Sequence, residues 1–286
     1  MGDRPMDDRS ADEAPGGDSS EDPGARHAAR EAGRTAADGR SGAYARSVLR
    51  IIDARTGQPV DAAPARRGLT RVEAHTEGFD VTALRVLLVA DLLVRALELG
   101  GTPVWALLDE QRQQAELRAG AAALGIRPFE DGRDAASGLG ETQVLHVVRE
   151  GGAEPDGVRV AVAAVHAPAP PEDADPAVLR LALLGRRRGV PLSLDAETLE
   201  EAHATLARWR HAVADWARRP SRPVPDEVRT ELRTAWEDDL DIPGVLGVLR
   251  RVESAPDLPD GARFETFAHA DRLLGVELTR DLGSPR

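Results

Sequence analysis

The sequence predicts an α/β layer followed by an all-α helical bundle. Between residues 47 and 165, short apolar runs that end at turn residues alternate with segments of helical periodicity, which is typical of a parallel sheet covered by helices. After Pro176 the apolar residues recur only at spacings of three and four, which indicates packed helices. We therefore assign residues 47–170 to a shortened α/β domain and residues 171–286 to the bundle.

Residues 1–46 are rich in Gly, Asp, Glu, Ser, Arg and Ala and contain almost no large apolar side chain. Such a segment cannot bury enough surface to offset its ordering entropy, so we predict a disordered tail. The first forty residues also lack the apolar stretch of a secretory signal. We therefore expect a soluble, cytoplasmic protein.

The composition excludes several classes of function. The net charge of −12 argues against a general nucleic-acid surface, because phosphate binding needs clustered positive charge. The chain has no cysteine, which excludes disulfides, thiolate metal sites and a cysteine nucleophile. It also has no lysine, so arginine supplies all 37 basic side chains.

The α/β part reads as five strands and two helices. The first helix, Val81–Leu99, is apolar on most of its circumference and should be buried between layers. Its four ionisable residues argue against a membrane helix, and two glycines at its end should stop it. The second helix should cover residues 110–124 and stop at Gly125. The strands are predicted at residues 48–53, 69–75, 102–108, 143–148 and 157–165.

The bundle should contain four or five helices. One apolar seam marks a long helix and consists of Leu199, Ala202, Leu206, Trp209, Val213 and Trp216. The prolines of residues 220–225 separate it from a helix over residues 226–240, in which Trp236 faces inward. Asp241 can cap the next helix, with Pro243 in its first turn, and residues 261–274 form the last helix. All three tryptophans fit core positions.

The stretch from Ala235 to Leu249 reads AWEDDLDIPGVLGVL, in which an acidic run, a proline turn and a small-apolar helix follow one another. This order resembles the bundle signature of the cysteinyl-tRNA synthetases, which are class I aminoacyl-tRNA synthetases. Further matches follow in order between Val48 and Leu278, namely VLRIIDARTGQPVDAAP, LRVLLVADLLVRALELGG, ALGIRPFEDGRD, DPAVLRLALLGRRRGVPLSL and RFETFAHADRLLGVEL. The resemblance implies a Rossmann-like nucleotide-binding fold joined to the family's helical bundle.

The departures from that family concern its reactive parts. Its zinc-binding strand cysteine falls on Ala74 or His75, so neither zinc nor any other metal is expected. Its His-Ile-Gly-His signature aligns on residues 80–83, where Asp80 would repel the phosphates that the histidines bind. The family's lysine loop would align with residues 165–175. That segment contains three prolines and three acidic residues, and His166 is its only possible cation. Much of the family's remaining zinc and cysteine pocket is missing between residues 134 and 158.

One group of residues is a candidate site. His75 ends a strand just before a helix N-terminus, where an α/β fold binds anions. The site would be a vestigial nucleotide crevice formed by His75, Thr76, Asp80, Thr82 and Arg85. The alternative is that Asp80 or Thr82 merely caps the helix and His75 is an ordinary loop histidine. The acids Glu77 and Asp80 favour this alternative.

Other polar groups have simpler interpretations. His203 and His211 lie eight residues apart on one helix and belong to a solvated face, since helical metal ligands sit three or four apart. The acidic run of residues 237–241 should be a structural turn, and the three arginines of residues 186–188 suit a helix end. No catalytic residue can be assigned.

These observations favour a catalytically silent relative of the cysteinyl-tRNA synthetases that binds a protein or a small ligand, without a cofactor. The charge and the missing anticodon-binding domain argue against tRNA as the partner, and nothing points to a membrane. The alternative is an ATP-dependent ligase that forms an aminoacyl adenylate at a rebuilt site and uses a non-tRNA acceptor. The family that the chain resembles includes such an enzyme, the cysteine ligase of mycothiol synthesis.

Overall fold

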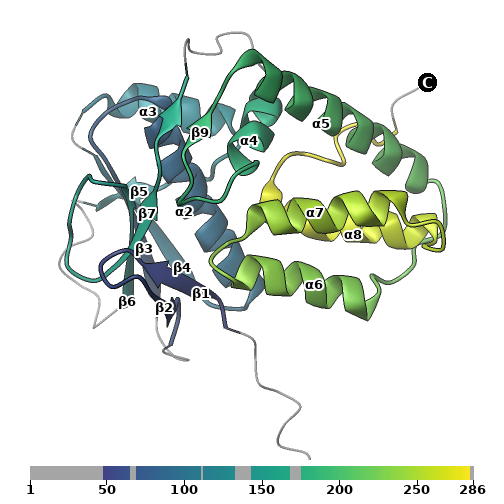
Figure 1. The fold of residues 1–286 in the computed structure, drawn as a ribbon, viewed down its shortest axis with the longest axis horizontal. Coiled ribbons are helices and arrows are strands. Elements are labelled where there is room, and N and C mark those ends of the chain that lie inside the picture. Colours follow the sequence, from purple (N-terminus) through teal and green to yellow (C-terminus); the bar gives the residue numbers. More distant parts are fainter. Residues whose placement is uncertain (1–47, 65–68, 111, 133–142, 168–174, 284–286) are drawn as a thin grey trace, which may run out of the picture. The chain divides into compact units, whose positions relative to one another are not determined.

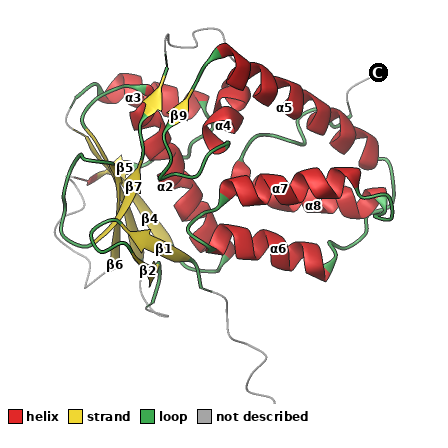
Figure 2. Ribbon diagram, in the orientation of Figure 1, coloured by secondary structure: helices red, strands yellow, loops and turns green. Residues whose placement is uncertain are grey.

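The computed structural model describes residues 48–64, 69–110, 112–132, 143–167 and 175–283. The predicted tail, residues 1–46, lies outside the described residues, as do residues 168–174, where the predicted domain boundary falls. Residues 47–286 form one compact unit. A parallel sheet covered by helices is followed by a group of helices, which confirms the predicted fold class (Figures 1 and 2).

The central sheet is parallel throughout and has the strand order β5-β4-β3-β6-β7. Its strands are β3 (Thr70–Thr76), β4 (Val104–Glu110), β5 (Glu130–Asp131), β6 (Gln143–Arg149) and β7 (Val158–Val162). The helices α2 (Val81–Leu99) and α3 (Gln114–Ala123) make the crossovers of the first half. This is the Rossmann strand order, in which the direction of winding reverses between β3 and β6.

The predicted start of α3, residue 110, lies four residues before the observed start. The strand β4 continues to Glu110, because its parallel pairing with β3 extends as far as Thr76 opposite Glu110. The helix then starts after Gln113, whose backbone is left-handed with a φ of 58°. In contrast, α2 has the predicted bounds.

In the described part of the chain, four short strands lie outside the central sheet. The strands β1 (Arg50–Asp53) and β2 (Gln58–Asp61) form an antiparallel hairpin, although the sequence predicted only a turn after β1. The turn includes Gly57 with a φ of 67°, which returns the chain to pair with β1. The strands β8 (Val165–His166) and β9 (Leu192–Ser193) form a parallel pair, so the predicted strand over residues 157–165 is divided between β7 and β8.

The helices of the bundle are α4 (Pro176–Leu184), α5 (Ala196–Trp216), α6 (Asp226–Glu237), α7 (Ile242–Ser254) and α8 (Asp260–Leu274). Trp209, Trp216 and Trp236 are buried as predicted, and the first two meet the Phe267 ring edge-on. The Asp241 side chain caps α7 by accepting a bond from the Gly244 N–H at 3.1 Å. Within the described ranges, no helix is both long and apolar enough to cross a bilayer.

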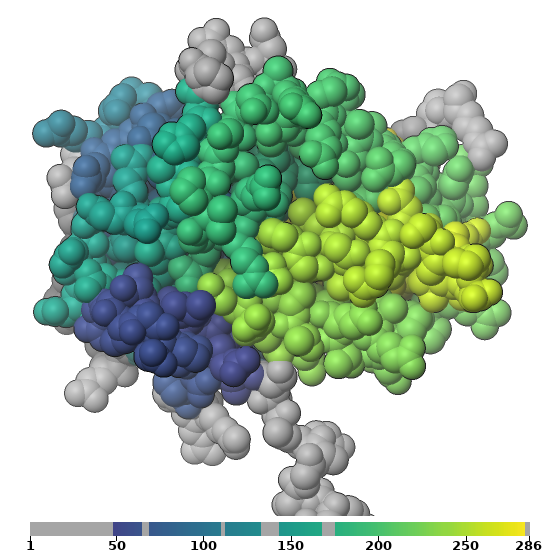
Figure 3. Space-filling model, viewed as in Figure 1, coloured from purple at the N-terminus to yellow at the C-terminus, as the bar shows by residue number. Residues whose placement is uncertain are grey.

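The acidic run after α6 is a structural turn, as predicted. Asp239 is left-handed with a φ of 55°, and its carboxylate accepts bonds from the Ile52 N–H and the Arg188 guanidinium. These bonds end α6 three residues earlier than predicted, because Asp239 turns towards the hairpin. Figure 3 shows the result, with the purple hairpin packed directly against the light green residues near 240.

Helix α2 lies between the sheet and the bundle, and 15 of its 19 residues are buried (Figure 1). Its Asp91 carboxylate is fully buried and accepts hydrogen bonds from Arg95 at 2.9 Å, Arg127 at 3.1 Å and Arg180 at 2.9 Å. Burial alone would raise the pKa of Asp91, but the positive charges of Arg180 and Arg95 and the hydrogen bonds hold it below its ordinary value. Asp91 is therefore an anion inside the protein.

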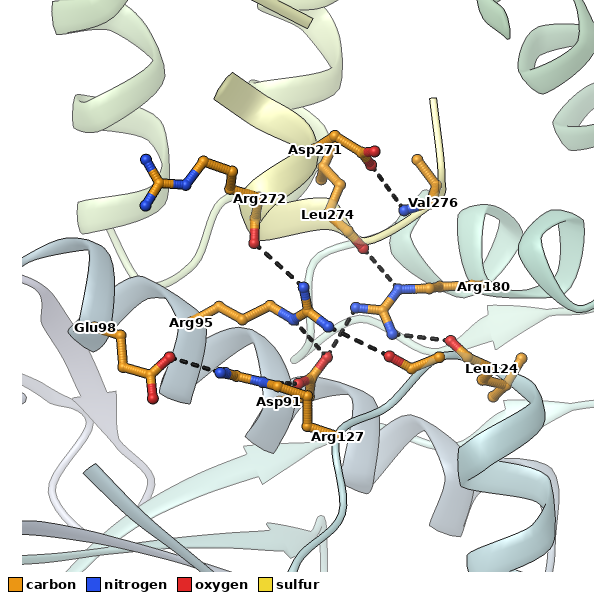
Figure 4. A network of polar contacts seen from close by, with 11 residues as sticks. Asp91, Arg95, Glu98, Leu124, Arg127, Arg180, Asp271, Arg272, Leu274 and Val276 are labelled. Carbon is orange, nitrogen blue, oxygen red and sulfur yellow. Dashed lines mark hydrogen bonds and ion pairs between the residues drawn. The ribbon is translucent and has the colours of Figure 1, made fainter. Parts of the chain in front are cut away.

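The fully buried Arg180 connects this carboxylate to the ends of two other helices (Figure 4). Its guanidinium also donates to the Leu274 carbonyl at the end of α8, at 2.6 Å, and to the Leu124 carbonyl after α3, at 3.0 Å. Helix carbonyls at these ends have no partner within their own helices, so Arg180 satisfies groups that burial would otherwise leave unpaired.

We expect Asp91→Asn to lower the free energy of unfolding by about 3–5 kcal/mol, because the neutral amide leaves Arg180 charged and buried without its counterion. Urea denaturation followed by circular dichroism measures this loss. Asp257→Asn, at an exposed aspartate, is the matched control and should change stability by less than about 0.5 kcal/mol. Equal stabilities for the two variants would contradict the role of Asp91.

Candidate functional site

A cavity of about 240 Å³ lies at the carboxyl ends of β3, β4 and β6, where the winding of the sheet reverses. In open α/β sheets, ligands bind at this reversal point. We call the cavity the switch-point crevice. Its polar lining consists of His75, Thr76, Glu77, Asp80, Asp109, Gln113 and Arg149.

Larger cavities lie elsewhere. One of about 530 Å³ lies between α4, α5 and α7, and one of about 730 Å³ lies between the hairpin and α6. The switch-point crevice is nevertheless the stronger candidate, because it combines the strand ends, a helix N-terminus and several titratable side chains.

The structure places three of the five predicted site residues in the crevice. His75 and Thr76 end β3, and Asp80 is the N-cap of α2. The Asp80 carboxylate accepts a bond from the Ala83 N–H at 2.6 Å, so the capping role is confirmed for Asp80. Its second oxygen forms an ion pair with Arg149 from the end of β6.

Thr82 and Arg85 point away from the crevice. The Thr82 hydroxyl is buried and accepts a bond from the Val165 N–H at 3.0 Å, so it does not cap the helix. The buried Arg85 guanidinium donates four bonds to the carbonyls of Ala163, Arg186, Arg187 and Val190. Burial lowers the pKa of Arg85 to about 10, which leaves it charged at neutral pH. These contacts indicate a structural role for both residues. Their side chains point away from the crevice because successive positions of a helix face different directions.

His75 is not a loop histidine, which corrects the simpler of the two predictions. It belongs to β3, and both ring nitrogens have partners. Its Nδ1 lies 3.1 Å from an Asp109 carboxylate oxygen, and its Nε2 lies 3.0 Å from Nδ1 of His146 on β6. Glu73, two residues earlier on the same face of β3, brings Oε2 to 3.2 Å from His146 Nδ1 and 3.8 Å from His75 Nε2.

The sequence did not predict this cluster. Glu73 and His146 lie directly opposite each other on neighbouring strands, but they are far apart along the chain. The available signal was the alternation of Glu73 and His75, which places both on one face of a strand. No metal ligands were expected, because the prediction considered a cysteine-containing zinc site and pairs of residues close in sequence, but no set of ligands from neighbouring strands. The three groups are nevertheless close enough together to hold one ion.

The protonation states of the cluster follow from its surroundings. A hydrogen bond from His146 holds the pKa of Glu73 below its ordinary value despite burial, with help from the Arg71 charge. Burial and the neighbouring His146 lower the pKa of His75, although Asp109 opposes the shift. At neutral pH, Glu73 is therefore a carboxylate and His75 a neutral imidazole.

The crevice itself is acidic. Among the described residues, its lining has three carboxylates, from Glu77, Asp80 and Asp109, and one guanidinium, that of Arg149, which is already paired with Asp80. His166, the only possible cation predicted for the lysine-loop region, lies in β8 opposite Ser193. Residues 168–174 of that region lie outside the described residues. The lining that the structure describes therefore suits a cationic group better than a polyphosphate.

Comparisons with curated proteins find similarity to ligases. The chain is 38% identical over 111 residues to the L-cysteine:1D-myo-inositol 2-amino-2-deoxy-alpha-D-glucopyranoside ligase of Streptosporangium roseum, and 40% identical over 111 residues to that of Streptomyces griseus. Each match covers 37% of this chain and 26% of the relative. The ligase of the same name from Segniliparus rotundus is 30% identical over 175 residues, which are 60% of this chain and 35% of the relative.

No family model matches the chain. The matched segments span about a quarter to a third of the length of these relatives. The expected relationship to ligases that use cysteine is thus supported by sequence similarity. That the chain is a degenerate member of such a group stays a prediction.

Substitutions at Asp80 should separate its cap from its ion pair. We expect Asp80→Ala to lower the free energy of unfolding by about 1 kcal/mol, because the Ala83 N–H loses its acceptor. Asp80→Asn keeps an acceptor oxygen and loses only an exposed ion pair, so it should cost less than about 0.5 kcal/mol. Urea denaturation of both variants tests this, and equal losses would show that the cap contributes nothing.

Proposed function

We propose that this chain binds a small amine-bearing molecule in the switch-point crevice and does not form aminoacyl adenylates. The observation that carries the proposal is the charge of the crevice, whose described lining has three carboxylates and one guanidinium that is already paired. A protonated amine gains charge-assisted hydrogen bonds from such a lining, whereas a triphosphate meets like charge.

The helix N-terminus supports the same conclusion. Phosphate groups commonly bind the free N–H groups at the start of a helix. In this chain, the Asp80 carboxylate accepts the bond from Ala83 and adds a negative charge beside the remaining N–H groups. Losing stabilisation of this kind in a transition state typically costs several kcal/mol, which would slow adenylate formation by orders of magnitude.

The names of the relatives indicate a ligand class. L-Cysteine carries an amino group, and so does the 2-amino-2-deoxy-glucopyranoside named as the second substrate of those ligases. An amino acid or an amino sugar is therefore our proposal for the ligand. The acidic crevice supports a small molecule over a protein partner, and we propose no nucleotide or other organic cofactor.

A second candidate function is an ATP-dependent ligase with a non-tRNA acceptor. Two observations favour it: the similarity to cysteine-using ligases, and the Arg149 guanidinium, which balances the Asp80 charge. If ATP displaced the Asp80–Arg149 pair, Arg149 would become available to a phosphate.

Calorimetric titration tests the amine. We expect L-cysteine or D-glucosamine to bind, and the matched N-acetyl compounds, which lack the charge, to bind at least tenfold more weakly. Glu77→Gln removes one exposed carboxylate of the lining and should weaken binding several-fold. Glu227→Gln, at an exposed position on α6, is the control and should not. Equal affinity for amines and their acetylated forms would refute the proposal.

Amino-acid-dependent ATP–pyrophosphate exchange distinguishes the two functions. We expect no exchange with any of the twenty amino acids, alongside an active cysteine ligase as positive control. We also expect millimolar ATP to leave the melting temperature unchanged, because a ligand stabilises a protein only if it binds the folded state. Exchange with any amino acid would establish the ligase instead.

A further inference from the structure

We propose that Glu73, His75 and His146 form a binding site for one borderline divalent metal ion, of which Zn²⁺ is representative. The three side chains are largely buried, with exposed fractions of 15%, 11% and 8%. Each presents one ligand atom to a common centre, and all three atoms lie within 4.8 Å of one another. The site does not depend on the proposed amine binding.

The distances fit a tetrahedral ion. Metal–ligand bonds of 2.0–2.1 Å at tetrahedral angles place neighbouring ligand atoms about 3.3 Å apart. The observed separations are 3.0 Å between the two histidine nitrogens, and 3.2 Å and 3.8 Å from these nitrogens to Glu73 Oε2. Shifts of a few tenths of an ångström would bring all three atoms to one ion.

The ligands stand on rigid elements. Glu73 and His75 project from the same face of β3, and His146 faces Glu73 across the parallel pairing of β3 with β6. These strands lie at the centre of the sheet, so the ligands are already assembled before an ion arrives.

Outer contacts orient each ligand. Asp109 holds His75 through Nδ1, which leaves the Nε2 lone pair directed at the cluster. Arg71 pairs with Glu73 Oε1 at 2.6 Å and leaves Oε2 for the ion. The backbone at Gly157 passes so close to the His146 ring that a Cβ there would lie 3.2 Å from ring atoms, which restrains the ring. Such outer contacts are usual around metal-binding histidines and carboxylates.

The state of the cluster without an ion also suits metal binding. Two imidazole lone pairs repel each other, so a separation of 3.0 Å requires one N–H between His75 Nε2 and His146 Nδ1. A metal ion replaces that single hydrogen and leaves two neutral imidazoles and one carboxylate as ligands. This requires the loss or transfer of one proton and no oxidant or other reactant.

The donor set selects the ion. Two imidazoles and one carboxylate suit Zn²⁺, Co²⁺ and Ni²⁺, whereas Mg²⁺ and Ca²⁺ prefer oxygen ligands alone. Three protein ligands leave a fourth position for an exchangeable group. Because His75 also lines the switch-point crevice, a bound ion would lie beside the ligand cavity.

Titration of the tag-free, chelator-treated chain with Co²⁺ and Zn²⁺ tests the site. We expect one equivalent of ion, a visible Co²⁺ spectrum of low coordination number, and displacement of Co²⁺ by Zn²⁺ but not by millimolar Mg²⁺. Glu73→Gln and His146→Gln should each weaken binding at least tenfold. His211→Gln, at a histidine with a side chain 78% exposed, is the matched control and should bind as the wild type does.

Asp109→Asn provides a second test, which remains valid if a variant at one of the three metal-binding residues fails to fold. Asp109 is 56% exposed, so its substitution should leave the circular dichroism unchanged while weakening metal binding about 10–100-fold through His75. The proposal is overturned if the folded wild type takes up no stoichiometric ion, or if Glu73→Gln and Asp109→Asn retain its affinity. Amine titrations of the chelator-treated protein test the proposed function separately.

Discussion

The carboxylate of Asp91 is the point on which the assembly of the sheet and the bundle depends. It is a buried anion on α2 with three guanidinium partners, and through Arg180 it connects the sheet layer to the ends of α3 and α8. A buried ion pair contributes little net stability when complete but is costly to break. The surrounding helices must therefore adopt the geometry that pairs Asp91 with its three arginines.

The same use of arginine recurs elsewhere in the fold. The two terminal nitrogens of Arg85 donate to four backbone carbonyls, and Arg188 joins the hairpin to the acidic turn through Ile52 and Asp239. Arg210 donates to the carbonyls of Val276 and Glu277. The planar guanidinium can satisfy several acceptors at once, which suits these crowded positions. Their positive charges consequently serve the packing of the chain and not its surface.

This distribution of charge explains the character of the candidate site. Because Arg85 on α2 points away from the crevice, the described lining of the crevice has a single guanidinium among three carboxylates. The neighbouring cluster of Glu73, His75 and His146 adds a second centre that favours positive charge. Both features favour cationic partners, an amine in one case and a metal ion in the other, and both lie at the carboxyl edge of the parallel sheet.

The sequence by itself determined the features that depend on near neighbours in the chain. The bounds of α2, the cap at Asp241, the buried tryptophans and the order of the longer strands and helices follow from periodicity and capping, which act within a few residues. For α2 the sequence left the cap open between Asp80 and Thr82. Even the position of the crevice after β3 follows from the strand–helix order. Only the tertiary structure decided which side chains meet there. It turned Arg85 and Thr82 away and brought His146 to His75, because pairing between strands joins residues that no local pattern relates.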